Sequence, residues 1–433
     1  MKPPWIHPRF CARRPWVGVA IVPMLIGLSG CRPSLLAHGL PRNDVSKGQI
    51  FVLVGLSSDE RFDSLTRKDA EKRLAILLDG FRSIHPQVRV QVQTLPSSDL
   101  IDVLIRRNRA GLSPDVVIVR GKTAMALEQQ KLINPQTYPP GQLAHLDQGA
   151  LHRLHLGDGR FLGLPIGLFP QVACYNRKRL PIPPATIKEL LSPASQVRIG
   201  LPMQLSELTW TLGSLGALDS VMAMTLGQPM TATLKQPVAA WLSWLRSPEL
   251  QQRTVFQVSQ DRLLDEMGAG RLDWIPCRGY DFDRLRRQLG PALAVAPLPS
   301  GPGGQASPFT IERVIALGVN SSPNQRRIAK DFVAFSINPV SQRAIALRSQ
   351  QELSVLTHLN LETSSSPILT ALMASNIQSG VNRQLNLKII NADIRSDGQM
   401  QNVFNRFLYG EIETSKVIDT LIEMLRPVSS RLP

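Results

Sequence analysis

The first part of the chain alternates between short apolar runs and longer amphipathic segments. Residues 50–56 are almost wholly apolar and predict a buried strand, while 88–93 alternate valine with polar residues, as a half-exposed strand does. Between them, 64–84 places apolar side chains at spacings of three and four, which predicts an amphipathic helix. The alternation continues with a helix near 98–109, a strand at 114–119 and a helix at 122–131. This β-α-β-α-β-α order predicts a mostly parallel sheet with helices on both faces.

The middle of the chain continues to mix the two patterns, and the end is almost wholly helical from residue 323 onward. Strands are expected at 171–176, 197–201, 272–277, 292–297 and 314–319. Helices are expected near 206–217, 237–246, 259–268 and 281–289. The fold class is therefore α/β, in which ligands bind at the carboxyl ends of the parallel strands.

The N-terminus has the pattern of an export signal. Residues 1–16 are basic and Pro-rich, and 17–27 form an apolar run that is too short to span a bilayer comfortably. The run ends in a motif that resembles a bacterial lipobox, in which the cysteine is lipidated: Leu28-Ser29-Gly30-Cys31.

We therefore expect a lipoprotein signal peptide at 1–30, a lipid on Cys31 and a flexible tether at 31–48. A plain signal peptide and a single membrane anchor are the alternatives, and a twin-arginine signal at Arg13-Arg14 is a third. The expected location is the cell envelope, with the protein facing the periplasm or the exterior.

Composition narrows the function classes. The 433 residues are 43% hydrophobic and 19% charged, and this single long apolar run excludes a multi-span membrane protein. The net charge is +16, and removal of 1–30 leaves +12, which attracts anionic surfaces or ligands. Nucleic acid is not the expected partner, because the basic residues are scattered and aromatic residues are only 5%.

Two cysteines remain after the leader and the lipidated Cys31 are set aside. Cys174 and Cys277 are 103 residues apart, and an exported setting is oxidising. One disulfide or two separate buried thiols would both fit this spacing, so the sequence leaves the choice open.

Five segments, in order along nearly all of 50–345 and its leader, carry a resemblance to a known family. They are the lipobox, FLGLP at 161–165 running to YNRK at 175–178, MGAGRLDWI at 267–275 followed by CRG at 277–279, VAPLP at 295–299 with GPGG at 301–304, and 316–329 with Phe332 and Phe335. Together they resemble the family 1 extracellular solute-binding proteins of ABC importers, the group that includes maltose-binding proteins.

The resemblance implies two α/β lobes of the type II periplasmic-binding-protein fold, joined by hinge strands that close on a solute. It implies no catalysis, no cofactor, an ABC permease as partner and a monomer. The expected domains are lobe 1 at 49–165 and 306–345, lobe 2 at 166–305, and a helical C-terminal region at 346–433 that packs on the lobes.

The sequence also departs from the family pattern. The family often has Gly-x-Trp in the cleft, where this chain has Cys277-Arg278-Gly279-Tyr280, and Lys178 replaces an acidic residue. A carbohydrate is the expected solute, with an anionic solute such as a sugar phosphate or organic acid as the alternative. An exported enzyme acting on envelope glycans and a relative that has lost solute capture are the other hypotheses.

The candidate ligand-binding residues lie after expected strands or in the segments that cross between lobes. They are Ser57, Ser58, Asp59, Arg120, Phe169, Gln171, Trp210, Arg278, Tyr280, Phe309 and Glu312.

Several of these candidates have a structural alternative. The group at 57–59 could cap a helix, Arg120 could be a solvated charge, and Trp210 could be a core residue. Glu312 could accept sugar hydroxyls or pair with Arg313. If Arg120, Arg278 and Arg313 converge, an anion becomes the attractive solute, since guanidinium groups bind carboxylate and phosphate in a bidentate manner.

Signals for catalysis or metal binding are weak. The chain contains no H-E-x-x-H, G-x-S-x-G or P-loop motif. A group of His145, His152, His155 and Asp158 has loose metal-ligand spacing, but we expect surface histidines there and no metal site.

Overall fold

The structure is a computed structural model that describes residues 47–56, 62–363, 365–380, 382–396 and 398–427. The predicted signal peptide at 1–30, the lipidation site Cys31 and all but the end of the tether at 31–48 lie outside the described residues, as do Ser57, Ser58 and Asp59.

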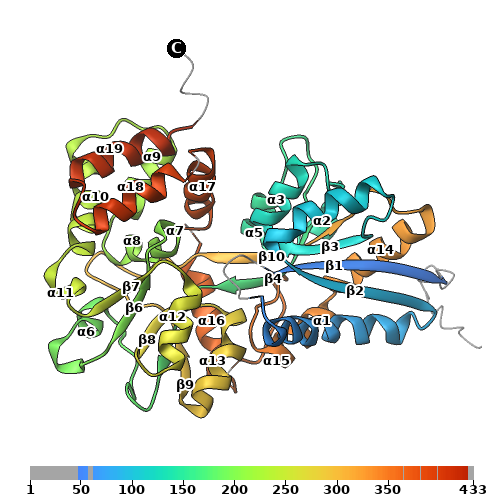
Figure 1. The fold of residues 1–433 in the computed structure, drawn as a ribbon, viewed down its shortest axis with the longest axis horizontal. Coiled ribbons are helices and arrows are strands. Elements are labelled where there is room, and N and C mark those ends of the chain that lie inside the picture. The colour runs from blue at the N-terminus through green and yellow to red at the C-terminus, as the bar shows by residue number, and fades with distance from the viewer. Residues whose placement is uncertain (1–46, 57–61, 364, 381, 397, 428–433) are drawn as a thin grey trace, which may run out of the picture. The chain divides into compact units, whose positions relative to one another are not determined.

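The first sheet has five strands in the order β2-β1-β3-β10-β4 (Figure 1). These are Val88–Pro96, Gly48–Leu56, Val116–Arg120, Thr310–Leu317 and Leu164–Pro170, in the same order. β1 pairs in parallel with β2 and β3, and only β10 runs against its neighbours. The predicted mostly parallel sheet is confirmed, and its order brings the carboxyl ends of β1, β3 and β4 to one edge.

Helices cover both faces of this sheet, as a β-α-β chain requires. α1 lies on one face, and α2 and α3 lie on the other (Figure 1). α1 buries Leu74, Leu77, Leu78 and Phe81, which are the apolar positions of its helical pattern. The helices of this lobe are α1 Ser64–Ile84, α2 Ser97–Arg109, α3 Gly121–Gln129, α4 Pro140–Leu143, α5 Gln148–Leu154, α14 Pro323–Ser336 and α15 Pro339–Ser349.

The second sheet also has five strands, in the order β7-β6-β8-β5-β9. They are Thr254–Gln257, Ile199–Pro202, Trp274–Cys277, Val172–Asn176 and Leu293–Ala296, in the same order. β6 is parallel to β7 and β8, whereas β5 runs against β8 and β9. One strand in each sheet therefore runs opposite to the others: β10 in the first sheet and β5 in the second. The chain enters each of these two strands from the other lobe.

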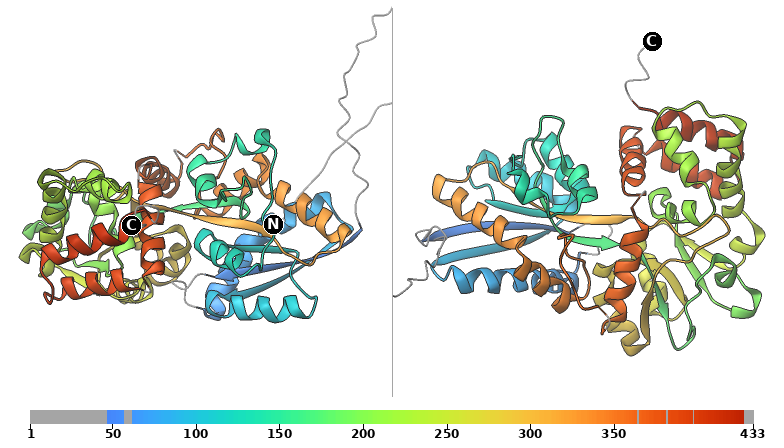
Figure 2. Two further views of the ribbon diagram at one scale, coloured as in Figure 1. Left: turned by 90° about the horizontal axis from the view of Figure 1, so that it is seen from above. Right: turned by 180° about the vertical axis from the view of Figure 1, so that it is seen from behind.

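Two connections carry the chain between the sheets. β4 of the first sheet continues through Gln171 into β5 of the second, and the segment after β9 returns through Phe309 into β10. The backbone N–H of Gln171 donates to the carbonyl of Phe309 at 3.1 Å, so the two connections run side by side (Figure 2). The structure thus has the two lobes and hinge strands that the resemblance implies.

The remaining helices belong to the second lobe and the C-terminal region. They are α6 Ile187–Leu190, α7 Leu205–Leu208, α8 Trp210–Ser214, α9 Leu218–Thr225, α10 Ala232–Leu245, α11 Pro248–Gln251, α12 Gln260–Gly268, α13 Phe282–Leu289, α16 Pro367–Gln378, α17 Asn382–Arg395, α18 Gln399–Leu408 and α19 Thr414–Leu425. Within the described residues, three short 3₁₀ turns complete the set: η1 Pro193–Ser195, η2 Gly279–Asp281 and η3 Gly290–Ala292.

The hydrophobic core has two parts. One runs from the first sheet through α16 to one face of the second sheet, because α16 contacts β4, β5 and β9. The other covers the opposite face of the second sheet and includes α17, α18 and α19, the red helices of Figure 1. α17, α18 and α19 therefore complete the second lobe, whereas the part of the C-terminal region before them packs on both sheets.

Two predicted helices differ from the structure. The helix expected at 206–217 is broken into α7 and α8 at Thr209. There the hydroxyl of Ser307 accepts the N–H of Gly213 and donates to the carbonyl of Thr209, the two groups that a continuous helix would bond to each other. The helix expected from Pro237 instead begins at Ala232 and contains the proline. Among the described residues, no helix is both long and apolar enough to cross a membrane.

Candidate functional site

The carboxyl edge of the first sheet presents two arginines on one face. Arg120 ends β3, and Arg313 is its direct cross-strand partner on β10. Residues paired in this way point to the same side of an antiparallel ladder. Phe169, near the end of β4, lies beside them, and the guanidinium carbon of Arg313 is 4.8 Å from the centre of its ring.

The second lobe contributes the strand end that faces these residues. β8 ends at Cys277, and the chain then turns through Arg278 into η2, where the carboxylate of Asp281 accepts the backbone N–H of Arg278 at 2.9 Å. This turn presents Tyr280, whose ring centre is 5.6 Å from that of Phe169. The guanidinium carbon of Arg120 lies 4.2 Å from the Tyr280 ring centre.

These four residues form a continuous row of contacts that joins the lobes, which we call the stack, although its two rings are tilted by 58° to each other. Its order is Arg313, Phe169, Tyr280, Arg120, so two rings lie between two guanidinium groups. Cation–π contacts of this kind contribute about 0.5–2 kcal/mol each, with the larger values where water is excluded. Three of the members come from the first sheet and one from the second lobe, so the stack forms only when the lobes are together.

A cavity of about 40 Å³ lies against this stack. Its polar lining consists of Arg73, Arg120, Arg313, Tyr280 and Glu352, and the rest is largely apolar, from β1, α1, β3, β4 and α15. A water molecule needs about 10–15 Å³ of such volume, so the cavity has room for about three. It is therefore a small site at the lobe junction.

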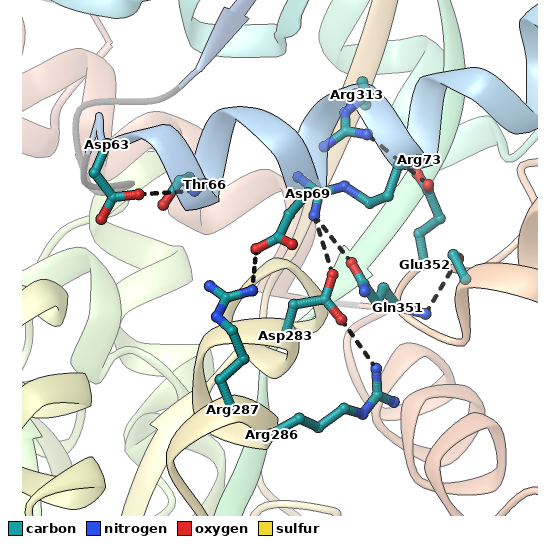
Figure 3. Close-up of polar contacts among 11 residues, drawn as sticks. Asp63, Thr66, Asp69, Arg73, Asp283, Arg286, Arg287, Arg313, Gln351 and Glu352 are labelled. Atoms are coloured by element: carbon teal, nitrogen blue, oxygen red, sulfur yellow. Dashed lines mark hydrogen bonds and ion pairs between the residues drawn. The ribbon is translucent and has the colours of Figure 1, made fainter.

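Arg73 and Glu352 extend the polar wall, as Figure 3 shows. Arg73 comes from α1, is 5% exposed, and donates to the Gln351 side chain at 3.1 Å. Glu352 lies 3.8 Å from Arg313. Burial raises the pKa of the Glu352 carboxyl, although Arg313 and Arg73 act in the opposite direction.

Direct contacts between α1 and α13 also hold the lobes together (Figure 3). Asp69 of α1 pairs with Arg287 of α13 at 2.6 Å, and Arg73 lies 3.8 Å from Asp283. We call these two pairs the α1–α13 contact.

A second polar cluster lies just behind the stack, in the hinge region. Arg278 is 1% exposed and pairs with Glu207 at 2.7 Å, and its guanidinium lies 4.3 Å from the ring centre of Phe309. The amide of Gln171 also donates to Glu207. Arg278, Phe309 and Gln171 are thus brought together as the pattern suggests, but in a buried network that does not line the cavity.

The structure places two other candidates away from the cavity. Trp210 is 1% exposed and packs in the core of the second lobe, 6.2 Å from Trp274 between ring centres. Glu312 accepts from Arg153 of α5 at 2.8 Å, and Arg313 faces Glu352 instead. Successive residues of a strand point to opposite faces, so Glu312 and Arg313 could not both face the cavity.

Three site residues were not identified from the sequence. Arg73 had a signal, because it stands between Ala70 and Leu77 on the apolar stripe of α1. Glu207 and Glu352 had none, since a charged side chain in a segment expected to be helical normally lies on the exposed face. In the part of the chain that the structure describes, no three histidine, cysteine or acidic side chains gather as a metal site would need.

Cys174 and Cys277 form a disulfide that joins β5 to β8, with their α-carbons 5.7 Å apart. The sequence left this pairing open. The bond fixes the end of β8 to β5 directly before Arg278, and so restrains the turn that presents Tyr280.

Comparisons with known proteins agree with this architecture. A structure of maltose-bound MalE3 from T. maritima is 17% identical, with a TM-score of 0.62, and the match covers 87% of this chain and 99% of that one. The GacH receptor of Streptomyces glaucescens is 13% identical, with a TM-score of 0.64 and coverage of 87% and 97%. The maltodextrin-binding protein MalE1 from L. casei is 16% identical, with a TM-score of 0.62 and coverage of 88% and 99%.

Sequence comparison gives a more direct result. A search of curated proteins finds no significant match. The family model described as bacterial extracellular solute-binding protein, however, matches residues 77–364, which is well over half of the chain and includes the hinge strands, the stack and the disulfide. The chain therefore belongs to the bacterial extracellular solute-binding protein family.

Proposed function

We propose that the protein captures a small polar solute where its two lobes meet and delivers it to the permease of an ABC importer. The observation that carries this proposal is the Arg313–Phe169–Tyr280–Arg120 stack, because residues of both lobes build one wall of the cavity. A solute that binds the closed form better than the open form would shift the equilibrium between them.

A carbohydrate is the solute class that the fold neighbours favour. The similar structures include proteins described with maltose and with maltotetraose. Aromatic faces and arginine N–H groups, both of which line this cavity, suit sugar rings and hydroxyls. The cavity of about 40 Å³ is smaller than a sugar ring, so uptake of a sugar requires the lobes to separate.

The proposal includes a lipid anchor on Cys31 and a location in the cell envelope. An anchored binding protein meets its permease at a raised effective concentration, because both are confined to one membrane. The disulfide between Cys174 and Cys277 supports an exported protein, since such bonds persist in oxidising compartments.

We infer binding rather than catalysis at this site. Glu207 and Glu352, two acidic residues near the stack, each lie beside an arginine, and Glu312 is held by Arg153. The arrangement supports a charged binding wall, whereas a glycan hydrolase needs a pair of carboxyl groups facing the scissile bond.

A thermal-shift screen tests the proposal. The full chain, purified in a mild detergent, is heated with mono- and oligosaccharides, polyols, sugar phosphates and organic acids. A ligand at one hundred times its dissociation constant adds about 2.7 kcal/mol of stability, and we expect at least one member to raise Tm by a few degrees.

Two variants show whether the ligand uses this site. Tyr280→Ala should lose the shift, because it removes one ring of the stack. Tyr409→Ala is the control, since Tyr409 is 69% exposed and lies in the C-terminal region. A panel in which nothing stabilises the protein would contradict solute capture and favour a relative that keeps the lobes without it.

A further inference from the structure

The end of the first sheet that lies opposite the cavity gathers basic side chains. β1 and β2 begin at this end and α2 finishes there, whereas the last residues of β1 line the cavity (Figure 1). The basic residues at these starts and at the last turn of α2 are Lys47, Arg89, Arg106, Arg107 and Arg109. We call these five residues the basic end.

Contacts between the three elements bring these side chains together. Gln49 of β1 pairs with Arg89 of β2, and Phe51, two residues further along β1, faces the same side of the sheet. The guanidinium carbon of Arg107 on α2 lies 4.6 Å from the centre of the Phe51 ring. Arg89 and Arg107 therefore share the face of the sheet that α2 covers.

The charges of the basic end are not balanced by neighbouring acids in the part of the chain that the structure describes. Four of the five side chains are exposed, and Arg107 is half-buried. No carboxylate of the described residues lies within ion-pair distance of any of the five, and this includes Asp102, one turn before Arg106 on α2. Arg82 near the end of α1, by contrast, pairs with Asp79 at 3.7 Å.

A local effect explains only part of this pattern. The dipole of a helix favours basic residues in its last turn, which applies to the three arginines of α2. Lys47 and Arg89 stand at the starts of strands, where no such effect acts. The group as a whole therefore indicates an anionic partner.

Two exposed apolar side chains stand at the same end. Leu112, in the loop directly after α2, is 64% exposed, and Ile84, which ends α1 shortly before β2 begins, is 55% exposed. Exposed apolar and basic side chains together suit the boundary between lipid head groups and acyl chains. This combination favours a membrane surface over a purely polar acidic partner.

The chain also enters the described fold at the basic end. Lys47 leads into β1 and comes sixteen residues after Cys31. A chain spans at most about 3.5 Å per residue, so a lipid on Cys31 would keep Lys47 within about 55 Å of the membrane surface. The basic end is thus the part of the first lobe that the proposed anchor would bring to the bilayer first.

We infer that the basic end binds the anionic phospholipid head groups of the membrane surface. This inference goes beyond the proposed function, because it does not depend on solute capture. Each Lys or Arg close to an anionic bilayer strengthens binding by about fivefold, so a group of five attaches the lobe measurably and reversibly. The cavity lies at the other end of β1 and stays clear of the bilayer.

A shortened chain of residues 45–433 tests this surface without the leader and Cys31. It forms one compact unit that holds both hydrophobic cores, so it can fold alone. Cosedimentation compares vesicles of phosphatidylcholine with vesicles that contain about one third phosphatidylglycerol. We expect binding to the second kind only, and loss of binding at about 0.5 M salt, where the screening length falls to about 4 Å.

Two triple variants locate the surface. Arg89→Gln, Arg106→Gln and Arg109→Gln together should weaken binding by about tenfold to a hundredfold, because each contact contributes about fivefold. The matched control removes the same charge from exposed residues of the second lobe: Lys188→Gln, Arg262→Gln and Lys416→Gln. This control should bind as the wild type does. Thermal unfolding shows that both variants fold, since substitutions of exposed residues change stability little.

A fluorescent probe at Leu112 shows whether this end touches lipid. The cysteines of residues 45–433 are the two of the disulfide, so Leu112→Cys introduces a single free thiol for an environment-sensitive fluorophore. Its emission should shift to the blue on vesicles with phosphatidylglycerol. Leu226→Cys is the control and should show no shift, because Leu226 is 57% exposed and follows α9 in the second lobe.

The outcomes separate this inference from the proposed function. Failure to bind vesicles with phosphatidylglycerol would overturn the inference, and solute capture would still stand or fall by its own thermal-shift screen. Equal losses in the two triple variants, or equal shifts of the two probes, would overturn the placement at the basic end. Binding to polyglutamate that depends on the basic end, without binding to vesicles, would overturn the membrane as partner and indicate an acidic protein.

Discussion

Gly279 of the second lobe lies directly against the backbone carbonyl of Gln351, so that a β-carbon at Gly279 would sit 1.5 Å from that oxygen. Gly279 begins the turn that presents Tyr280, and Gln351 precedes Glu352 in the cavity wall. The close approach of these two backbones therefore depends on a glycine at this position.

Replacing Gly279 with alanine should force the turn and the Gln351 segment apart. Overpacking costs about 1–3 kcal/mol, so we expect Gly279→Ala to lower Tm by a few degrees and to weaken solute binding by displacing Tyr280. Gly157→Ala is the control, because a β-carbon at Gly157 meets no atom within 4 Å. Differential scanning calorimetry that gave both variants the wild-type Tm would contradict this role.

The α1–α13 contact should bias the lobes toward closure. An exposed ion pair contributes about 0.2–1 kcal/mol, so Arg287→Gln, which removes the partner of Asp69, should increase the open fraction by up to about fivefold. Small-angle X-ray scattering of the unliganded protein measures the change as a larger radius of gyration. Arg271→Gln serves as control, since Arg271 pairs with Glu266 inside the second lobe. High salt should increase the radius of gyration of the wild type and leave that of Arg287→Gln nearly unchanged. The opposite pattern would contradict a role of this ion pair in closure.

The disulfide should be a substantial source of stability. It closes a loop of 103 residues, and removal of a cross-link of this kind costs about 2–4 kcal/mol. We expect the double variant Cys174→Ala/Cys277→Ala to unfold at lower urea concentration than the wild type. Reductant should shift the wild-type midpoint and leave that of the double variant unchanged. Identical midpoints for the two proteins in oxidising buffer would rule out a stabilising bond.

Glu352 should make stability depend on pH in a direction opposite to that of most acidic residues. Burial raises its pKa in the folded state, so the protonated form favours folding. This contribution is complete below the ordinary glutamate pKa and is lost as pH rises through the raised value. Glu352→Gln, which keeps the neutral form at every pH, should therefore raise Tm near neutral pH relative to the wild type.

The advantage of the Glu352→Gln variant should disappear in acid. Thermal unfolding of both proteins across pH 4–8 measures this difference in Tm. Asp331→Asn is a useful comparison, since burial also raises the pKa of Asp331 but that residue lies on α14, away from the cavity. A Glu352→Gln protein that is less stable than the wild type at pH 7 would show that the ionised form pairs favourably with Arg313.

The strands and helices with strong periodicity could be predicted from sequence. β1 and α1 are the clearest cases, because an apolar run and an amphipathic stripe each leave little choice of structure. β7 was missed, since Thr254–Gln257 is a short strand without an alternating pattern of its own. The predicted start of a helix at Pro237 was wrong by five residues. The helix α10 begins at Ala232 and contains the proline.

The site was only partly predictable. Strand ends indicated Arg120 and Tyr280, and the segment that crosses between the lobes indicated Phe169. The structure brings these three residues to the cavity, and their part in ligand binding stays a prediction. Only one of Glu312 and Arg313 can face the cavity, because successive residues of a strand point to opposite faces. Which one does so became clear only once the start of β10 was known. Glu352 could not be found in this way, since only the tertiary packing of α14 and α15 brings its irregular segment to the cavity.

The strand order of the first sheet has a consequence for the time course of folding. β10 lies between β3 and β4, although it follows them by well over a hundred residues in the chain. β4 therefore has no partner in that sheet until β10 has been synthesised, and contacts so distant in sequence form slowly. The core of the second lobe likewise waits for α19 near the end of the chain. A nascent chain of this protein should thus stay incompletely folded until synthesis is nearly finished, which is the state in which a secretion channel can still thread it.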